Sequence, residues 1–199
     1  MRVFGYIKNL RFDGNGNSLI GLYVQDTSQF ELDNIIGCSC IDREYLIDKK
    51  GKTGSAVVLA NNMRFTNGYE YGLNNCKENS VAMYIDSPDS HYENVVTLGY
   101  KDHIILNSLN FMNKIHSWNY KEDTINESCM FKIGAQAVLT DVYSDTLQTM
   151  FDITGTGSVD CVNPIFFLNG DFYKTTHNKP TPIIVSDDFV KKMKNNIVF

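Results

Sequence analysis

The sequence is poor in proline, tryptophan and arginine, and it has no long apolar run. It contains four prolines and one tryptophan in 199 residues, and its arginines are limited to Arg2, Arg11, Arg43 and Arg64. No stretch of about 18 apolar residues is present, so no membrane span is expected. The net charge of −5 at pH 7 also argues against nucleic acid as a partner, because phosphate binding needs a basic face.

The cysteines follow no pairing pattern. They are Cys38, Cys40, Cys76, Cys129 and Cys161, and this odd count argues against a disulfide framework. Cys38 and Cys40 could place two thiols on one face of a strand, but no cluster of Cys or His partners follows them. We therefore expect buried, reduced cysteines, and we predict neither a metal site nor a cofactor.

One four-residue pattern returns seven times along the chain. An apolar residue and a variable residue are followed by Asn in five cases, Asp in one and Cys in one. These third positions are Asn9, Asn34, Asn67, Asn94, Asn113, Asp141 and Cys161. Successive third positions are 25, 33, 27, 19, 28 and 20 residues apart. Self-similarity at such periods is typical of a repeat architecture.

Upstream of six tetrads lies a short segment with apolar residues at positions i and i+2, which an extended strand places on one face. These pairs are Leu22/Val24, Val57/Leu59, Met83/Ile85, Ile104/Leu106, Phe131/Ile133 and Phe151/Ile153. A coil of about twenty residues that goes once around an axis connects parallel strands without a helix. The sequence therefore predicts an all-β fold, a single-stranded right-handed parallel β-helix of about seven coils over residues 1–170.

The repeated asparagine has a physical reason in such a fold. Asn tolerates left-handed backbone conformations, so it suits a sharp bend between two strands. Stacked Asn side chains can also bond to one another from coil to coil, which predicts an internal ladder. Asp141 and Cys161 would interrupt this ladder.

Polar segments between the repeats are expected to be loops, and the chain end is expected to be a cap. Residues 41–54, 72–80 and 119–128 are the predicted loops. Residues 171–199 are predicted to form a C-terminal strand and helix, or a tail, that covers the last coil. Within them Ile183–Val185 has the composition of a strand, and Ser186 is a good N-cap for a short helix.

Several segments resemble a known family. The run Ile7–Asn15 (IKNLRFDGN) is similar to an opening seen in the pectate-lyase-like superfamily of right-handed β-helices. The segments Ser90–Tyr100, His103–Asn107 and Phe111–Trp118 resemble coils of phage tailspike and tail-fibre proteins. The resemblance covers roughly residues 3–165, and no catalytic motif of the family maps onto this chain residue by residue.

The resemblance implies a module of a phage tail spike or fibre that binds bacterial surface polysaccharide. It also implies a homotrimer, contact with other virion tail proteins, and a place in the virion after folding in the host cytoplasm. The alternative is a polysaccharide depolymerase on the same fold, a glycoside hydrolase rather than a lyase, because lyases usually need basic residues and arginine is scarce. A structural shaft is the third hypothesis. Binder and hydrolase remain open at this point.

Hydrolysis of a glycosidic bond needs two carboxylates on opposite sides of that bond. The candidate acids are Asp86 and Glu93, which could lie on one wall of the fold, and Asp145. His116 is a candidate base beside Asp145. The alternative is that these side chains are simply solvated groups of an outer face.

Three aromatic residues are candidates for sugar binding: Trp118, Tyr120 and Tyr143. An exposed aromatic face packs on the apolar side of a pyranose ring, and its polar edge can hydrogen-bond hydroxyl groups. For Trp118, the alternative is that the ring packs beneath the predicted loop at 119–128.

Overall fold

The computed structural model describes residues 4–15, 18, 20–25, 29–38, 43–48, 59–66, 80–119, 128–167, 171–175 and 183–185. Within these ranges the chain forms strands and no helix. Every strand pair is parallel, and the strands form two sheets. The expectation of an all-β fold with parallel strands is therefore confirmed for the described part of the chain.

The first sheet has nine strands. Its order is β1 (Phe4–Asp13), β3 (Gln29–Cys38), β5 (Leu59–Thr66), β7 (Ser90–Leu98), β9 (Asn110–Trp118), β11 (Gln136–Asp145), β13 (Ser158–Val162) and β16 (Ile183–Val185), and β14 (Ile165–Phe167) also pairs with β11. The second sheet has seven strands. From the N-terminal side they are β2 (Ile20–Gln25), β4 (Arg43–Asp48), β6 (Val81–Asp86), β8 (Asp102–Leu106), β10 (Cys129–Ile133), β12 (Thr149–Ile153) and β15 (Asp171–Thr175).

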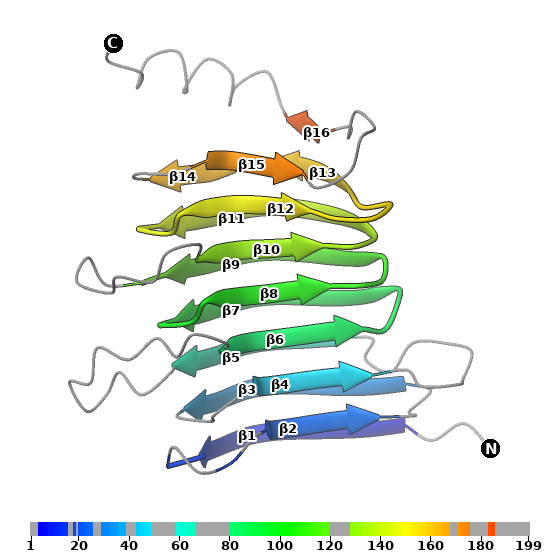
Figure 1. Cartoon of the computed structure of the whole chain (residues 1–199). Coiled ribbons are helices and arrows are strands. Elements are labelled where there is room, and N and C mark those ends of the chain that lie inside the picture. The colour runs from blue at the N-terminus through cyan, green and yellow to red at the C-terminus, as the bar shows by residue number, and fades with distance from the viewer. Residues whose placement is uncertain are drawn as a thin grey trace.

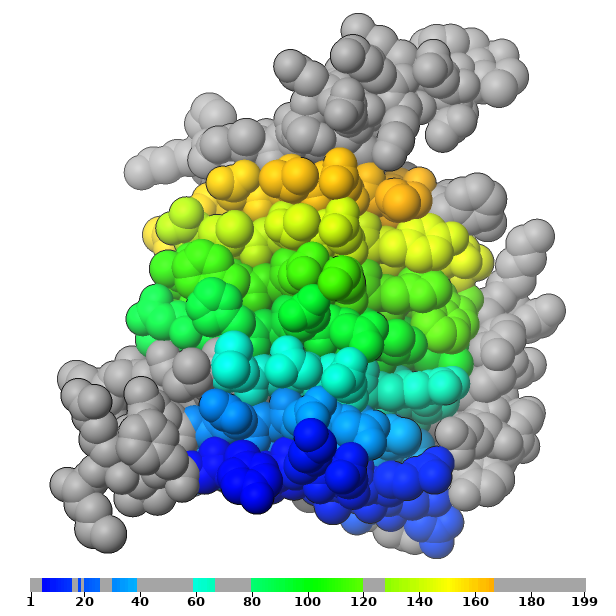
Figure 2. All heavy atoms as spheres, turned by 180° about the vertical axis from the view of Figure 1, so that it is seen from behind, coloured from blue at the N-terminus to red at the C-terminus, as the bar shows by residue number. Residues whose placement is uncertain are grey.

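From β1 to β13 the chain passes alternately from one sheet to the other (Figure 1). We call one strand of the nine-stranded sheet, together with the next strand of the seven-stranded sheet, a rung. Successive rungs stack along one axis, with β1 at one end and β16 at the other (Figure 1). Figure 2 shows the molecule from the side of the nine-stranded sheet, where the rungs form bands from blue to orange.

The predicted apolar pairs lie in the seven-stranded sheet in five of six cases. They fall on β2, β6, β8, β10 and β12, and Ile104, Phe131 and Phe151 stand in register with Met83 from strand to strand. The exception is Val57/Leu59, because Val57 lies outside the described residues and Leu59 begins β5 in the other sheet.

Residues 41–54 were expected to form a loop, but they contain strand β4, which lies between β2 and β6 in the seven-stranded sheet. This prediction was wrong. Strand β4 pairs with β2 and β6, and it places Tyr45 opposite Leu22 and Met83. Tyr45 and Ile47 are themselves an i, i+2 pair, which the charged residues around them obscured in the sequence. The other two predicted loops lie mostly outside the described residues.

Each strand of the nine-stranded sheet from β1 to β11 contains one residue with a positive φ angle, and another follows β13. These residues form a single register, which we call the corner column: Asn9, Asn34, Asn62, Asn94, Lys114, Asp141 and Asn163. Their φ angles lie between 52° and 60°. Asn and Asp adopt this left-handed region more readily than other residues with a side chain, which explains why they hold six of the seven positions.

The predicted column was right for Asn9, Asn34, Asn94 and Asp141 and wrong for the other three positions. The third corner is Asn62, whereas the predicted Asn67 lies outside the described residues. The fifth corner is Lys114 instead of its neighbour Asn113. The seventh is Asn163 instead of Cys161, whose buried side chain is part of the core.

The left-handed corner changes which side chains face inward. Strand residues normally alternate between the two faces, but here the residues two before and one after each corner are both inside. Around Asn94 these are Tyr92 and Val95, with exposed fractions of 1% and 0%. The corner residue and its predecessor both face solvent, so the side chains of the corner column lie outside. The expectation of an internal ladder was therefore wrong.

The corner side chains do form a ladder on the surface. Asn34 donates from Nδ2 to Oδ1 of Asn9 over 2.7 Å, and Asn94 donates in the same sense to Asn62 over 2.6 Å. Asn163 donates to Asp141 over 3.1 Å. These bonds tie neighbouring rungs together at the point where each strand bends.

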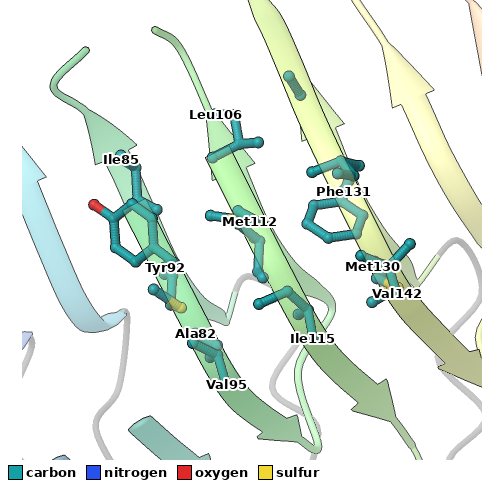
Figure 3. Close-up of a cluster of buried hydrophobic side chains, with 14 of the residues drawn as sticks. Ala82, Ile85, Tyr92, Val95, Leu106, Met112, Ile115, Met130, Phe131 and Val142 are labelled. Atoms are coloured by element: carbon teal, nitrogen blue, oxygen red, sulfur yellow. The ribbon is translucent and has the colours of Figure 1, made fainter. Parts of the chain in front are cut away.

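The core lies between the two sheets. Val95, Ile115 and Val142 follow one another across β7, β9 and β11, and each is at most 1% exposed (Figure 3). Burying a side chain of this size fully stabilises the folded state by about 1.5–3 kcal/mol. The contacts between aliphatic side chains in register on neighbouring strands stabilise the stacked rungs.

The inward column three residues after the corner changes from aromatic to polar. Phe12 and Phe65 lie at its N-terminal end with ring centroids 6.2 Å apart, and Gly37 stands between them in register. A Cβ atom at Gly37 would collide with the ring of Phe12, so glycine makes room for the ring. Thr97 and Ser117 continue this column on the next rungs.

Thr97 and Ser117 belong to a hydrogen-bonded network inside the core. Their hydroxyl oxygens lie 2.7 Å apart, and Thr97 Oγ1 lies 2.7 Å from Nδ1 of His103. The other ring nitrogen of His103 lies 3.1 Å from Oδ1 of Asn119, whose amide also donates to the backbone oxygen of Tyr100. Burial lowers the pKa of His103 to about 3, so the ring is neutral at pH 7.

Both sheets continue past the predicted domain boundary at residue 170. Strand β15 pairs with β12, and β16 pairs with β13, so Ile183–Val185 is a strand as expected. The predicted helix from Ser186 lies outside the described residues.

The corner column predicts different losses of stability for alanine substitutions at Asn94, a corner residue of β7, and at Asn113, a residue of β9 that is not a corner. Asn94→Ala should destabilise the protein by about 1–2 kcal/mol, because alanine pays the full cost of the left-handed backbone. Asn94→Gly should cost less, because glycine adopts this backbone freely. The matched control is Asn113→Ala, which should change stability little. Urea unfolding measures all three, and an equal loss in Asn94→Ala and Asn113→Ala would contradict the assignment.

The buried His103 predicts an acid-sensitive core. Its folded pKa is depressed below the unfolded value of 6.5, so its stability contribution is complete above pH 6.5 and is lost as pH falls toward 3. The loss should approach about 1.4 kcal/mol for each pH unit in this window. His103→Gln removes the titrating group. The free energy of unfolding, measured with urea at several pH values between 6.5 and 4, should therefore fall less steeply with decreasing pH in this variant than in the wild type. Identical slopes would contradict the prediction.

Candidate aromatic cluster and groove

Most of the predicted site residues lie on the outer face of the nine-stranded sheet. Glu93 is on β7, His116 and Trp118 are on β9, and Tyr143 and Asp145 are on β11. Asp86 is the last residue of β6, in the seven-stranded sheet, and Tyr120 lies outside the described residues.

Four of these residues come together and form what we call the aromatic cluster: His116, Trp118, Tyr143 and Asp145. The parallel register of β9 and β11 places His116 opposite Tyr143 and Trp118 opposite Asp145. The imidazole centroid lies 4.5 Å from the Trp118 ring and 4.5 Å from the Tyr143 ring. Three flat rings are thus held in contact by two neighbouring strands.

Hydrogen bonding and burial define the electrostatics of the cluster. The Tyr143 hydroxyl donates to Oδ2 of Asp145 over 3.4 Å, and burial, with a smaller contribution from this carboxylate, raises the pKa of Tyr143. Burial lowers the pKa of His116, and the charge of Asp145 opposes this shift. The His116 imidazole is therefore neutral at pH 7, and among the described residues its buried Nε2 atom has no hydrogen-bond partner.

Asp86 and Glu93 do not share a wall of the fold. Strands β6 and β7 are consecutive in the chain but belong to different sheets, so the two carboxylates lie on different walls. Asp86 accepts a hydrogen bond from Ser108 over 3.1 Å. Glu93 accepts one from Lys114 Nζ over 2.9 Å, which makes an exposed ion pair.

A groove on the same sheet was not predicted. It lies beside the corner column, on the side where each strand begins, and we call it the amide groove. Its larger hollow, of about 670 Å³, is lined by Glu31, Leu32, Asp33, Leu59, Asn61, Asn62, Glu93, Asn94 and Lys114. A smaller hollow of about 270 Å³ is lined by Tyr6, Ile7, Lys8, Glu31 and Asp33. Glu31 and Asp33 line both hollows, so the two lie next to each other.

Two ion pairs neutralise most of the charge in the amide groove. Lys8 Nζ lies 2.9 Å from Asp33, and Lys114 Nζ lies 2.9 Å from Glu93. The hydrogen bond with Asp33 raises the pKa of Lys8, and the bond with Glu93 raises that of Lys114. The pKa of Asp33 is lowered by the hydrogen bond from Lys8 and by a second one from Asn62.

These arrangements favour binding over acid–base chemistry. A general acid in glycoside hydrolysis needs a raised pKa, whereas the pKa of Asp33 is lowered. No hydrogen bond joins His116 to Asp145 in the described part of the chain, so the carboxylate does not orient the imidazole as a base. Within that part, no group of three or more His, Cys, Asp or Glu side chains is placed to hold a metal ion.

The groove could have been found from the corner column. Once a corner is assigned, the residues one and three positions before it must face outward, and in successive rungs these include Lys8, Glu31, Asp33, Asn61 and Glu93. The inward apolar positions alone do not mark this outward strip.

No helix among the described residues is long and apolar enough to cross a membrane. Comparison of the chain with protein-family models, with curated proteins and with solved structures gave no match.

Proposed function

We propose that the chain is a module of a phage tail spike or tail fibre that binds bacterial surface polysaccharide. In this proposal it belongs to the virion tail, assembles as a homotrimer and contacts other tail proteins. The observation that carries the proposal is the aromatic cluster, in which Trp118 and Tyr143 flank His116 on the outer face of a rigid sheet.

The proposed architecture is a single-stranded right-handed parallel β-helix of about seven coils, like those of the pectate-lyase-like superfamily. Its support is the regular alternation of the chain between two parallel sheets. The strands β2, β4, β6 and β8 run to the right at the front of Figure 1, the rear strands run to the left, and later rungs lie higher. This sense of advance is that of a right-handed turn.

The cluster has the chemistry of a sugar site. The faces of Trp118 and Tyr143 can pack against the apolar side of a pyranose ring. Asp145 can accept hydrogen bonds from sugar hydroxyls. All these groups stand on paired strands, so little conformational entropy is lost when a ligand binds.

A hydrolase is the less favoured alternative because the cluster contains one carboxylate. The other candidate acids lie apart from it: Asp86 is in the seven-stranded sheet, and Glu93 is paired with Lys114. A retaining or inverting mechanism needs a second carboxylate across the scissile bond, about 5–10 Å away. Among the described residues the cluster does not provide it.

The test is an array of purified bacterial capsular and O-antigen polysaccharides, probed for binding and for released reducing ends or unsaturated products. We expect the wild-type protein to retain at least one polysaccharide without releasing product. Trp118→Ala should weaken that binding about tenfold or more, because a stacking face is lost.

The matched control for this test is Tyr23→Ala, which removes an exposed tyrosine from β2 in the other sheet. It should bind like the wild type. Equal losses in both variants, or no retained polysaccharide at all, would contradict the proposal. Product release that disappears in Asp145→Asn would favour the hydrolase instead.

A further inference from the structure

We propose that the amide groove is a second carbohydrate subsite, separate from the aromatic cluster, and that it takes an extended, uncharged polysaccharide strand. The inference rests on the proposed function and names a further site and its ligand class. The ligand would lie along the stacking axis, across β1, β3, β5, β7 and β9, and would offer hydroxyl or N-acyl groups to the protein.

The shape of the groove supports an elongated ligand. The smaller hollow, of about 270 Å³, is lined by Tyr6 and Lys8 and shares Glu31 and Asp33 with the larger one, of about 670 Å³. The larger hollow ends at Lys114, on the fifth strand of the sheet. The groove therefore crosses several rungs in one line.

The polar groups of the groove repeat at the spacing of the strands, about 4.8 Å. Each strand from β1 to β9 of the nine-stranded sheet lines the groove with its corner residue, with the residue before it, or with both, so a polymer with a short repeat meets polar groups at regular steps. Asn61 and Asn62 on β5 occupy these two positions, and Glu93 and Asn94 do so on β7. A compact ligand would contact the polar groups of only one strand.

The ladder leaves hydrogen-bonding capacity for a ligand. A primary amide has two N–H donors and two acceptor lone pairs. Asn94 uses one donor on Asn62, and Asn62 uses one donor on Asp33. The Asn61 side chain makes no hydrogen bond with any residue that the structure describes. Several amide donors and acceptors thus face the groove, and these groups match hydroxyl and N-acyl groups.

The charges of the groove disfavour an anionic ligand. Lys8 and Lys114 are paired with Asp33 and Glu93, so an anionic ligand would have to compete with these two carboxylates. Glu31 has no ion-pair partner among the described residues, which leaves the lining with one uncompensated negative charge. The hydrogen bonds of these pairs raise the pKa values of both lysines.

The groove also has apolar surface on which sugar rings can rest. Tyr6 is 76% exposed at one end, and Leu59 is 39% exposed in the larger hollow. Such surface packs against the apolar face of a pyranose while the amides bond its hydroxyls. The mixture of apolar surface, amides and paired charges suits an uncharged glycan.

The test compares two tryptophan variants at equivalent positions. Asn61→Trp puts a large ring into the groove, and Thr140→Trp puts the same ring at the same register position of β11, outside the groove lining. The probes are an array of neutral and anionic bacterial polysaccharides, and fragments of increasing length from a retained neutral polysaccharide.

The wild-type protein should retain neutral polysaccharides in preference to anionic ones and should bind longer fragments more tightly. Asn61→Trp should remove the gain with length and lower the affinity for long fragments about tenfold. Thr140→Trp should bind like the wild type, and thermal unfolding of both variants should confirm that they are folded.

Three other outcomes count against specific claims. If Asn61→Trp binds every fragment like the wild type while Trp118→Ala loses affinity, the groove inference fails and the proposed function stands. If the retained polysaccharides are mainly anionic, the assigned ligand class is wrong. If no polysaccharide is retained by the wild-type protein, the proposed function itself fails.

Discussion

The structure depends on one left-handed residue in each rung. Asn34 and Asn94 hold φ angles of 57° and 55° in the middle of otherwise extended strands. This backbone bends the strand and displaces the inside–outside alternation by one residue. The core then receives side chains from both sides of the bend, such as Leu32 and Ile35 around Asn34, which are at most 1% exposed. Because the parallel register repeats from strand to strand, one bend per rung aligns all the corners in a column.

The same constraint creates the two surfaces that the function would use. Before the bend, the outward strip carries the amides and ion pairs of the amide groove. After the bend, the residues two and four positions beyond Lys114 are His116 and Trp118, which meet Tyr143 and Asp145 on the next rung. Lys114 stands between the two surfaces, since its side chain lines the groove and its backbone makes the corner. A change at a corner should therefore affect both.

Much of the fold could be predicted because the buried positions of the strands recur in the sequence as apolar residues at regular spacings. The apolar pairs of β2, β6, β8, β10 and β12 were identified correctly, and so were four of the corners. The three wrong corners arose because only the apolar residue two positions earlier was required. A second requirement, an apolar residue directly after the corner, would have corrected the first two of them. Met63 and Ile115 follow the true corners Asn62 and Lys114. The predicted corners Asn67 and Asn113 are followed by Gly68 and Lys114, which are not apolar side chains.

The candidate site was less accessible from the sequence, because it depends on register. Taking Asn113 as the corner would place His116, three residues later, in line with Ser144, which is three residues after Asp141, whereas the structure places His116 opposite Tyr143. Sequence separation alone also suggested that Asp86 and Glu93 share a wall, although consecutive strands belong to different sheets. The amide groove is formed by polar residues of variable type, such as Lys8, Asp33 and Asn61, and no residue pattern marks them until the corners are known.

The most direct test of the central claim is the backbone conformation of the corner residues in solution. Three-bond couplings between the amide and α protons, together with chemical shifts, report φ for each residue by nuclear magnetic resonance. We expect positive φ at Asn62, Lys114 and Asn163, and extended backbone at Asn113 and Cys161. Extended backbone at the first three, with positive φ at Asn113 and Cys161, would contradict the central claim.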